Sequence, residues 1–209
     1  MTSDAVKALF TRADGSYLFA RWGRPIVPVI FGVDDATLAV FKGAIEAVVA
    51  LAGHKMAETD PELGANLMLF FVRDWEDLRH VPNLDQLVVG LGPLLDKLQA
   101  TGANQYRVFR FDSDGAIKAA VVFLRMDAHL TEVPAETLAL SQAVQIILLW
   151  AERAFADAPP LALAGGVEIL RPQIGDLIRA AYDRVMPVMA QDASHALRLA
   201  ARVSVGGRQ

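Results

Sequence analysis

The sequence predicts an α+β fold, in which a mixed sheet of about four to five strands packs against helices and a C-terminal helical segment closes the chain. Apolar runs of strand length alternate with amphipathic helical stretches over residues 1–130. Residues 105–126 alternate around the turn DSDG, as an antiparallel hairpin does. Residues 131–209 carry mostly the helical spacing of apolar side chains. We expect a single domain over residues 1–209, with an α/β part followed by a helical part.

The length and composition are those of a folded protein with a sizeable core. The chain has 209 residues, of which 54% are hydrophobic and 21% are charged, and a chain of this size buries about 70% of the surface that its unfolded form exposes. It contains no cysteine. Disulfide bonds and thiolate metal sites are therefore excluded.

Charge and hydropathy limit the classes of partner. The chain has 20 basic and 24 acidic side chains, a formal net charge of -4, and no run of Lys and Arg that could follow a phosphate backbone. We therefore expect no nucleic-acid partner. No apolar run approaches the ~20 residues that span a bilayer, and the first residues lack the basic and apolar regions of an export signal. We expect a cytoplasmic protein without a membrane span.

Caps, turns and prolines define the first elements. A short helix is predicted over residues 3–10, and a turn at 14–15 leads into extended residues 16–22. The extended run 23–32 contains two prolines, which cannot donate ladder hydrogen bonds and so favour an edge strand or the end of a strand. Residues 34–53 begin with two aspartates and end with a glycine, and the spacing of their apolar side chains predicts an amphipathic helix.

The middle of the chain combines a buried strand with an interrupted helix. ANLMLFFV, residues 65–72, is a continuous apolar run, which is typical of a strand buried on both faces. Residues 83–99 have helical spacing, but they include Gly90, Gly92 and Pro93. We expect these three residues to bend or split the helix.

The last part of the chain is predicted to be helical apart from one loop. A helix starts within residues 131–134 and continues through LSQAVQIILLWAERAFAD, residues 140–157. A stretch rich in Pro, Ala and Gly, residues 156–166, is predicted to be a loop. Two closing helices follow, over residues 172–186 and 192–204.

Few residues have a spacing that indicates chemistry. The four histidines are scattered, without a second His or a carboxylate at ligand spacing, and His195 is predicted to lie on a surface helix. We therefore predict neither a metal site nor a cofactor. The alternative is a hydrolase with an active site that folding assembles from distant residues, for instance Glu58, Glu62, Asp112 or His129.

Three polar side chains stand out in the otherwise apolar stretch 140–157. Ser141 and Gln145 are four residues apart, and Gln142 and Gln145 are three apart, so all three are predicted to project into one sector of the helix. They favour two interpretations. The first is a buried polar network in which the amides satisfy backbone groups of a neighbouring loop. The second comes from a family resemblance.

Three stretches of the chain carry this resemblance: FARWGRPIVPVIFG (19–32), ANLMLFFV (65–72) and the closing stretch 170–203. The closing stretch is the most specific, because it contains an L-x-P-x-x-x-x-L-x-x-x-x-Y-D run that leads into a final helix. Together they resemble a family of bacterial proteins of unknown function with a fold similar to that of the metzincin-type zinc peptidases. The resemblance extends over about residues 17–204, and it implies a zincin-like fold.

The resemblance places the peptidase motif on SQAVQ. In zinc peptidases of this type, an HExxH helix supplies two metal-binding imidazoles and a Glu that polarises the attacking water. Here Ser141 and Gln145 fall at the ligand positions, and Gln142 falls at the general-base position. A hydroxyl and neutral amides bind Zn²⁺ poorly, and an amide accepts no proton at neutral pH. Leu148 and Ala151 stand where a turn glycine and a third ligand are expected, so the helix is predicted to run on past Leu148.

These departures predict a catalytically inactive, zinc-peptidase-like domain that acts as a binding or interaction module. The candidate residues of its former cleft are Ser141, Gln142, Gln145 and Glu152. We expect the cleft to receive a protein or peptide segment along a sheet edge. The alternatives are the hydrolase named above and a structural homo-oligomer subunit, which would present an apolar surface on its terminal helices and form a homodimer.

Overall fold

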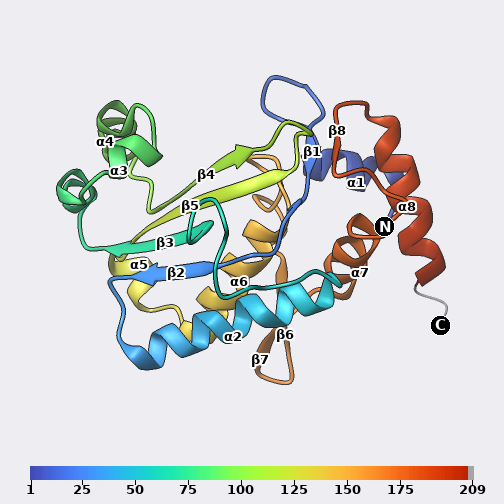
Figure 1. Ribbon diagram of the computed structural model, residues 1–209. Coiled ribbons are helices and arrows are strands. Elements are labelled where there is room, and N and C mark those ends of the chain that lie inside the picture. The colour runs from blue at the N-terminus through green and yellow to red at the C-terminus, as the bar shows by residue number, and fades with distance from the viewer. Residues whose placement is uncertain (207–209) are drawn as a thin grey trace.

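The computed structural model describes residues 1–206 and has an α+β architecture (Figure 1). The main sheet has four strands in the order β2-β3-β5-β4, which are β2 (Pro28–Phe31), β3 (Leu67–Val72), β4 (Gln105–Phe111) and β5 (Ile117–Arg125). β2, β3 and β5 are parallel to one another, whereas β4 pairs with β5 in the antiparallel sense. The predicted mixed sheet and the predicted hairpin at residues 105–126 are confirmed.

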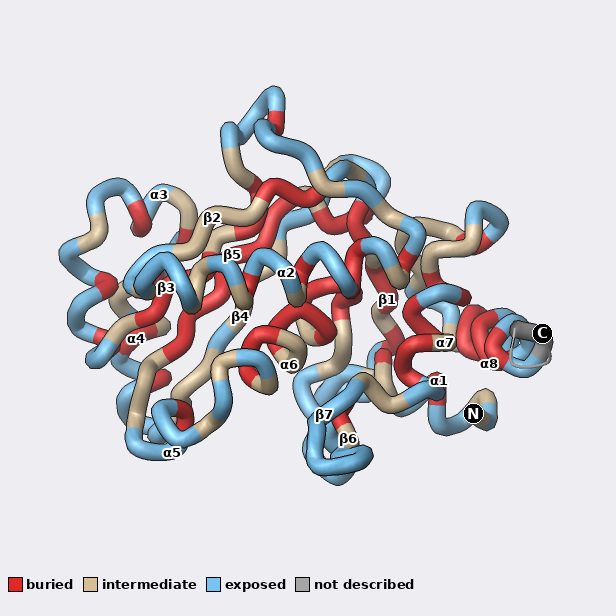
Figure 2. Tube along the Cα trace, turned by 90° about the horizontal axis from the view of Figure 1, so that it is seen from below, coloured by how far each residue is buried: buried red, intermediate tan, exposed pale blue. Residues whose placement is uncertain are grey.

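One face of the sheet carries the main core. Helices α2 (Asp35–Leu51) and α6 (Ala135–Ile147) pack on this face. The buried side chains of β3 and β5 directed at them are apolar, as in Leu69 and Val122, which are both fully buried. The predicted amphipathic helix at 34–53 is confirmed, with Asp34 as its N-cap. In Figure 2 the buried parts of these strands and of α6 form the centre of the molecule.

The other face of the sheet carries a second core. A 3₁₀-helix, η1 (Trp75–His80), and helices α3 (Leu84–Leu87) and α4 (Leu91–Ala100) cover it. Phe123 of β5 is fully buried there, because successive side chains of a strand point to opposite faces. The predicted split of the helix at 83–99 is confirmed, since Gly90 adopts a positive φ of 75° between α3 and α4.

Both ends of the chain meet beside the main sheet. Helix α1 (Ser3–Phe10) packs against α8 (Ser194–Gly206), as predicted for a short helix at residues 3–10. The two-residue strand β1 (Phe19–Ala20) pairs with β8 (Met189–Ala190). Figure 1 shows α1, α7, α8 and this small ladder at one end of the molecule. No helix within residues 1–206 combines the length and the apolar character that a bilayer span requires.

The loop predicted at residues 156–166 is partly wrong. Leu161–Ala164 and Val167–Leu170 form the antiparallel strands β6 and β7. The turn between them is Gly165-Gly166, and both residues have positive φ, 59° and 84°. Two such residues make the tight turn that matches the twist of a hairpin. The C-terminal part is therefore interrupted by a hairpin, which is exposed in Figure 2.

The closing helices are confirmed, but the position predicted for His195 is wrong. α7 (Pro172–Ala181) and α8 begin at about the predicted residues, and residues 207–209 lie outside the described part. His195 is fully buried rather than on a surface. Its Nδ1 lies 2.9 Å from the Tyr17 hydroxyl, and its ring lies 4.3 Å from that of Phe19. Helix α8 turns this side chain inward because α1 and β1 cover that face.

Burial of His195 should make the protein less stable in mild acid. Burial, with a smaller contribution from Arg198, lowers the pKa of His195 to about 4. The unfolded chain takes up this proton at about pH 6.5, so the free energy of unfolding should fall as the pH drops from about 6.5 to about 4, by up to ~1.4 kcal/mol per pH unit from this group. Urea unfolding at about pH 7 and about pH 5 measures the effect. His195→Gln should reduce the difference, whereas His129→Gln, which changes an exposed histidine, should leave it unchanged.

Candidate functional site

Helix α6 carries the SQAVQ motif, and it ends earlier than predicted. Its N-cap is Pro134, within the predicted start, but its last residue is Ile147. Leu148 is extended, with φ -134° and ψ 158°, and it forms a bridge with Arg21. The N–H of Leu149 then donates to the carbonyl of Ala20 at 2.9 Å. The prediction that the helix runs on past Leu148 is therefore wrong.

Side chains from distant parts of the chain explain this end. The last carbonyls of a helix have no partner within the helix. Three aromatic side chains donate to them, each at 2.8 Å: Trp150 Nε1 to Val144, Trp22 Nε1 to Ile146, and the Tyr182 hydroxyl to Ile147. Burial raises the pKa of Tyr182 above its ordinary value, so its hydroxyl stays a donor.

The L-x-P-x-x-x-x-L-x-x-x-x-Y-D run that supported the family resemblance has structural roles. Pro172 is the first residue of α7, and Leu177 is fully buried. Tyr182 caps α6, and Asp183 forms an ion pair with Arg202 of α8. This run therefore connects the motif helix to the closing helices.

Gln142, at the general-base position of the motif, belongs to a polar network with the edge strand β4. Its side chain is only 1% exposed. Its Nε2 donates to Gln105 Oε1 at 2.8 Å, and its Oε1 accepts from Arg107 Nη2 at 2.7 Å. The same Arg107 nitrogen donates to Gln105 Oε1 at 3.1 Å. The partners of Gln142 are thus side chains of β4, not the loop backbone that the structural interpretation expected.

Ser141 and Gln145, which the resemblance places at the two ligand positions, contact each other. Gln145 Nε2 donates to Ser141 Oγ at 3.0 Å, and both side chains are half-buried. Glu152, the fourth candidate, lies on the segment after α6, where it pairs with Arg12 at 3.6 Å and accepts from the N–H of Ala13. The structure therefore brings Ser141 and Gln145 together, and it places Glu152 in an exposed contact with the loop after α1.

A groove runs beside β4 and contains several of these residues. It has a volume of about 630 Å³, and we call it the β4 groove. The β4 residues Gln105–Phe111, except Arg110, form one side, and the other side comes from Gln145 and residues 149–156. Trp150 and Phe155, with rings 4.9 Å apart, supply apolar wall. Arg12 and Glu152 line the same groove.

A smaller cavity of about 170 Å³ lies beyond the Gln142 network. Gln105 lines both hollows, whereas Ser141 and Gln142 line only the smaller one. His129 and Glu168 also line it, but the His129 imidazole and the Glu168 carboxylate form no hydrogen bond or ion pair with each other. The polar triplet of α6 is therefore divided between two hollows.

Two of the residues named for the alternative hydrolase, Asp112 and His129, are far apart. Asp112 precedes β5 and His129 follows it, and the nine residues of this strand span about 30 Å. Asp112 Oδ1 accepts from the backbone N–H groups of Asp114 and Ala116 at 2.9 and 3.0 Å, as in a turn. Glu58 is exposed. The structure does not bring these residues into one site.

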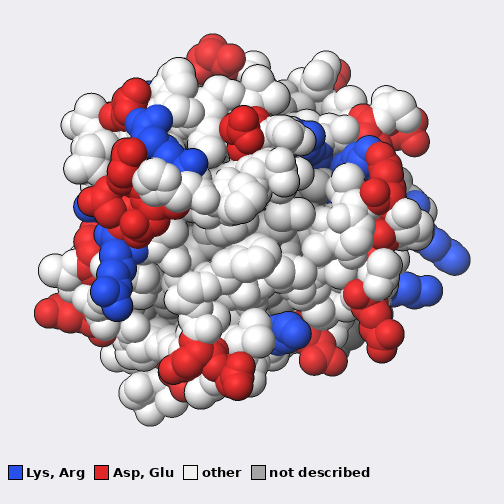
Figure 3. Space-filling view, turned by 60° about the vertical axis from the view of Figure 1, so that its left-hand side comes forward, with Lys and Arg blue, Asp and Glu red and all other residues white. Residues whose placement is uncertain are grey.

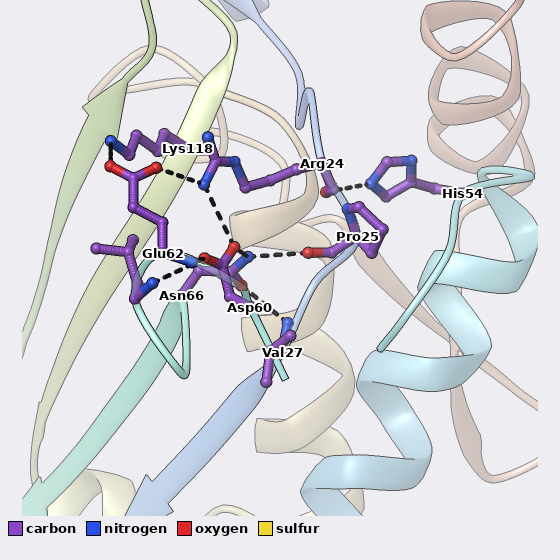
Figure 4. A network of polar contacts seen from close by, with 9 residues as sticks. Arg24, Pro25, Val27, His54, Asp60, Glu62, Asn66 and Lys118 are labelled. Atoms are coloured by element: carbon purple, nitrogen blue, oxygen red, sulfur yellow. Dashed lines mark hydrogen bonds and ion pairs between the residues drawn. The ribbon is translucent and has the colours of Figure 1, made fainter. Parts of the chain in front are cut away.

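Glu62, the remaining member of that set, belongs to a structural network (Figure 4). It forms ion pairs with Arg24 and Lys118. Below it, the buried Asn66 accepts from the N–H of Val27 at 2.8 Å and donates to the carbonyl of Pro25 at 2.8 Å and to Asp60 at 3.0 Å. All of these groups are partnered, which is typical of a network that fixes loops.

Asp60 is the charged centre of this network. Its Oδ1 accepts from the backbone N–H groups of Glu62 and Leu63, each at 2.9 Å. Burial acts to raise the pKa of Asp60, but the hydrogen bonds from Leu63, Glu62, Asn66 and Arg24 outweigh it and hold the pKa below its ordinary value. A carboxylate held ionised in this way is a poor general acid.

Sequence reasoning missed Arg107 and Gln105. In the register of the hairpin, Gln105 lies opposite Leu124 and Arg107 opposite Val122, so both point to the face that α6 covers. A signal was present, because QYRVF places polar residues at alternate positions of a strand with a buried partner. Burial lowers the pKa of Arg107 to about 10.

The surface shows no sign of a nucleic-acid interface on the face seen in Figure 3. Lys and Arg lie there in small groups next to Asp and Glu, around an uncharged centre. Within residues 1–206, no three His, Asp or Glu side chains are grouped so that they could share a metal ion. The candidate site is therefore the β4 groove with the Gln142 network at its side.

Fold and site together define an α+β protein with a mixed four-stranded sheet and a groove along its antiparallel edge strand. The sequence matches no protein-family model, no curated protein and no solved structure.

Proposed function

We propose that this protein is a non-catalytic binding module, related in fold to zinc peptidases, that holds an extended peptide segment in the β4 groove. The observation that carries the proposal is the free edge of β4 beside the groove. Among the described residues, β4 pairs only with β5, and unpaired backbone groups of an edge strand accept an added strand.

The two edges of the sheet differ in a way that supports this choice. β2 lies at the other edge and begins with Pro28, which has no N–H to donate. β4 has seven residues and no proline. The β4 groove also offers the aromatic side chains of Phe109, Trp150 and Phe155, which can hold apolar side chains of a peptide.

The lack of catalysis follows from the chemistry of the motif positions. Ser141 and Gln145 are neutral and bond to each other. Gln142 is an amide, and Gln105 and Arg107 already occupy its two polar ends. Neither a metal-binding imidazole nor a proton-accepting carboxylate stands at these positions.

Peptide binding can be measured with two pools of acetylated, amidated hexapeptides. Both pools carry Val, Leu, Thr or Tyr at five positions, and position three is Glu in one pool and Gln in the other. Added together to ¹⁵N-labelled protein, they should shift the backbone amide signals of β4 and of residues 145–156. N-methylation of alternate peptide bonds should weaken binding by about tenfold or more, because an added strand loses its main-chain hydrogen bonds. If neither pool shifted the β4 signals, the proposal would be overturned.

Catalysis is tested on the same preparation. Protein purified without chelators should contain no stoichiometric transition metal, and it should not cleave the two pools. Cleavage that stops on dialysis against a chelating agent would contradict the inactive assignment.

A homodimer through the terminal helices stays a prediction. Val185 and Leu197 are exposed near the two closing helices, at 61% and 60%. Light scattering at several protein concentrations gives the mass in solution.

A further inference from the structure

Arg107 is a charged group of the candidate site whose guanidinium has only neutral partners, whereas Arg12 and Glu152 of the same groove pair with each other. It lies on the α6 side of β4 and lines the β4 groove. Its Nη2 donates to the side-chain oxygens of Gln105 and Gln142. Its Nε is buried and has no hydrogen-bond partner.

No carboxylate compensates this charge in the described part of the chain. Arginines 12, 24, 79, 125, 179 and 202 each form an ion pair with Asp or Glu, but Arg107 forms none. Arg21 and Arg171 are also partly buried and without a carboxylate. The Arg21 guanidinium lies 5.2 Å from the centre of the Tyr182 ring, Arg171 donates to the carbonyl of Pro159, and neither lines the hollows described above. Arg107 therefore combines three features: partial burial, no anion, and a place in a groove.

This arrangement is costly in the free protein. A cation taken out of water loses several kcal/mol of solvation unless an anion is close, and two amide oxygens offset only part of that. The pKa of Arg107 is lowered by burial alone, with no acidic neighbour to raise it. A guanidinium of this kind binds carboxylates through two parallel hydrogen bonds.

The position of Gln142 points to where that anion comes from. A glutamate at residue 142 would place a carboxylate 2.7 Å from Arg107, at the distance now occupied by the amide oxygen. The chain has an amide there instead. The anion is therefore left to be supplied from outside, through the groove.

We propose that Arg107 binds the acidic side chain of an Asp or Glu in the extended peptide that occupies the β4 groove. This inference rests on the proposed function. A side chain of the ligand is favoured over its C-terminus for two reasons. Arg107 is the third of seven residues in β4, so the peptide continues past it in both directions. It also projects to one face of the sheet, where every second side chain of an added strand lies.

The two hexapeptide pools test this when they are titrated separately. The Glu pool should half-saturate the β4 shifts at a concentration about tenfold or more below that of the Gln pool, as expected for a hydrogen-bonded charge pair. Arg107→Met should remove this preference. Arg110→Met is the matched control, because Arg110 is on the same strand but donates to the carbonyls of Gln86 and Leu87. It should keep the preference.

Gln142→Glu is a second variant, which keeps Arg107 in place. Its carboxylate should pair with the guanidinium inside the protein and reduce the Glu-pool preference about tenfold. Urea unfolding should show that Arg107→Met and Gln142→Glu are at least as stable as the parent, because the first removes the uncompensated charge and the second supplies a carboxylate that compensates it. If Arg107 had only a structural role, Arg107→Met would be less stable than the parent. Gln142→Glu would then bind the two pools with the same preference as the parent.

The outcomes separate this inference from the proposed function. Equal binding of the Glu and Gln pools along β4 would overturn the role of Arg107 and leave the binding module in place. A third pool, with Gln at position three and a free C-terminal carboxylate, would overturn the choice of a side chain if it bound more tightly than the Glu pool. Loss of all shifts with every pool would overturn both proposals.

Discussion

Trp22→Ala should lower the free energy of unfolding by about 4 kcal/mol, because the indole fills the core and also caps the motif helix. The side chain is fully buried. Its Nε1 donates to the carbonyl of Ile146 at 2.8 Å, and its backbone N–H donates to the Tyr182 hydroxyl at 3.3 Å. Truncation leaves a large cavity and an unpartnered carbonyl at the end of α6. Urea unfolding monitored by circular dichroism measures the loss.

Two smaller variants separate packing from capping. Trp22→Phe keeps most of the ring volume but removes the donor, and Tyr182→Phe removes only the hydroxyl that reaches the carbonyl of Ile147. Each should cost about 1 to 2 kcal/mol. Amide hydrogen exchange in the last turn of α6 should rise in both. If Trp22→Ala were no more damaging than Trp22→Phe, the assignment of Trp22 to the core would be wrong.

The same contacts show what a sequence can and cannot predict here. The caps and turns of α2, the edge position of β2 and the β4–β5 hairpin all depend on neighbouring residues, such as Asp34 before its helix or the prolines in 23–32. These were predicted. The end of α6 was not, because the donors that stop it are Trp22 and Tyr182, each more than 30 residues away, at separations of 124 and 35 residues.

His195 and Arg107 were misjudged or missed for a related reason. The spacing of α8 is amphipathic, but only the packing of α1 and β1 decides that His195 faces inward. In the sequence, Arg107 has the pattern of a solvated residue on an edge strand. Its partial burial follows only from the packing of α6 against β4, which brings Gln142 into contact with it. Periodicity indicates which residues share a face, and it does not indicate what covers that face.

The neutral amides of the candidate site hold a charged side chain. Gln142 and Gln105 orient the guanidinium of Arg107 without neutralising it, since amides accept hydrogen bonds but carry no charge. A histidine- and glutamate-bearing helix in the same place would instead favour a cation. Gln142, the α6 residue that contacts Arg107, offers it a hydrogen-bond acceptor but no counter-charge.

Asn66→Ala should lower the free energy of unfolding by about 3 kcal/mol, since one buried amide holds three partners together. Asn66 is 1% exposed and joins Pro25 and Val27, before β2, to the Asp60 loop before β3 (Figure 4). Alanine leaves the Val27 N–H and the Pro25 carbonyl without these contacts. The change in the urea midpoint gives the magnitude.

Glu62→Gln is the matched control for this network. It removes ion pairs with Arg24 and Lys118, but the Glu62 side chain is 53% exposed, so the cost should be much smaller than that of Asn66→Ala. Acid adds a second readout. The lowered pKa of Asp60 means that its contribution to stability is present above its unfolded pKa and is lost as the pH falls through the folded value. Asn66→Ala removes one of the hydrogen bonds that lower this pKa, so in the variant this acid-dependent loss should be smaller and should be complete at a higher pH than in the parent. Equal losses in Asn66→Ala and Glu62→Gln would show that surface charge, rather than the buried amide, holds the loops before β2 and β3 together.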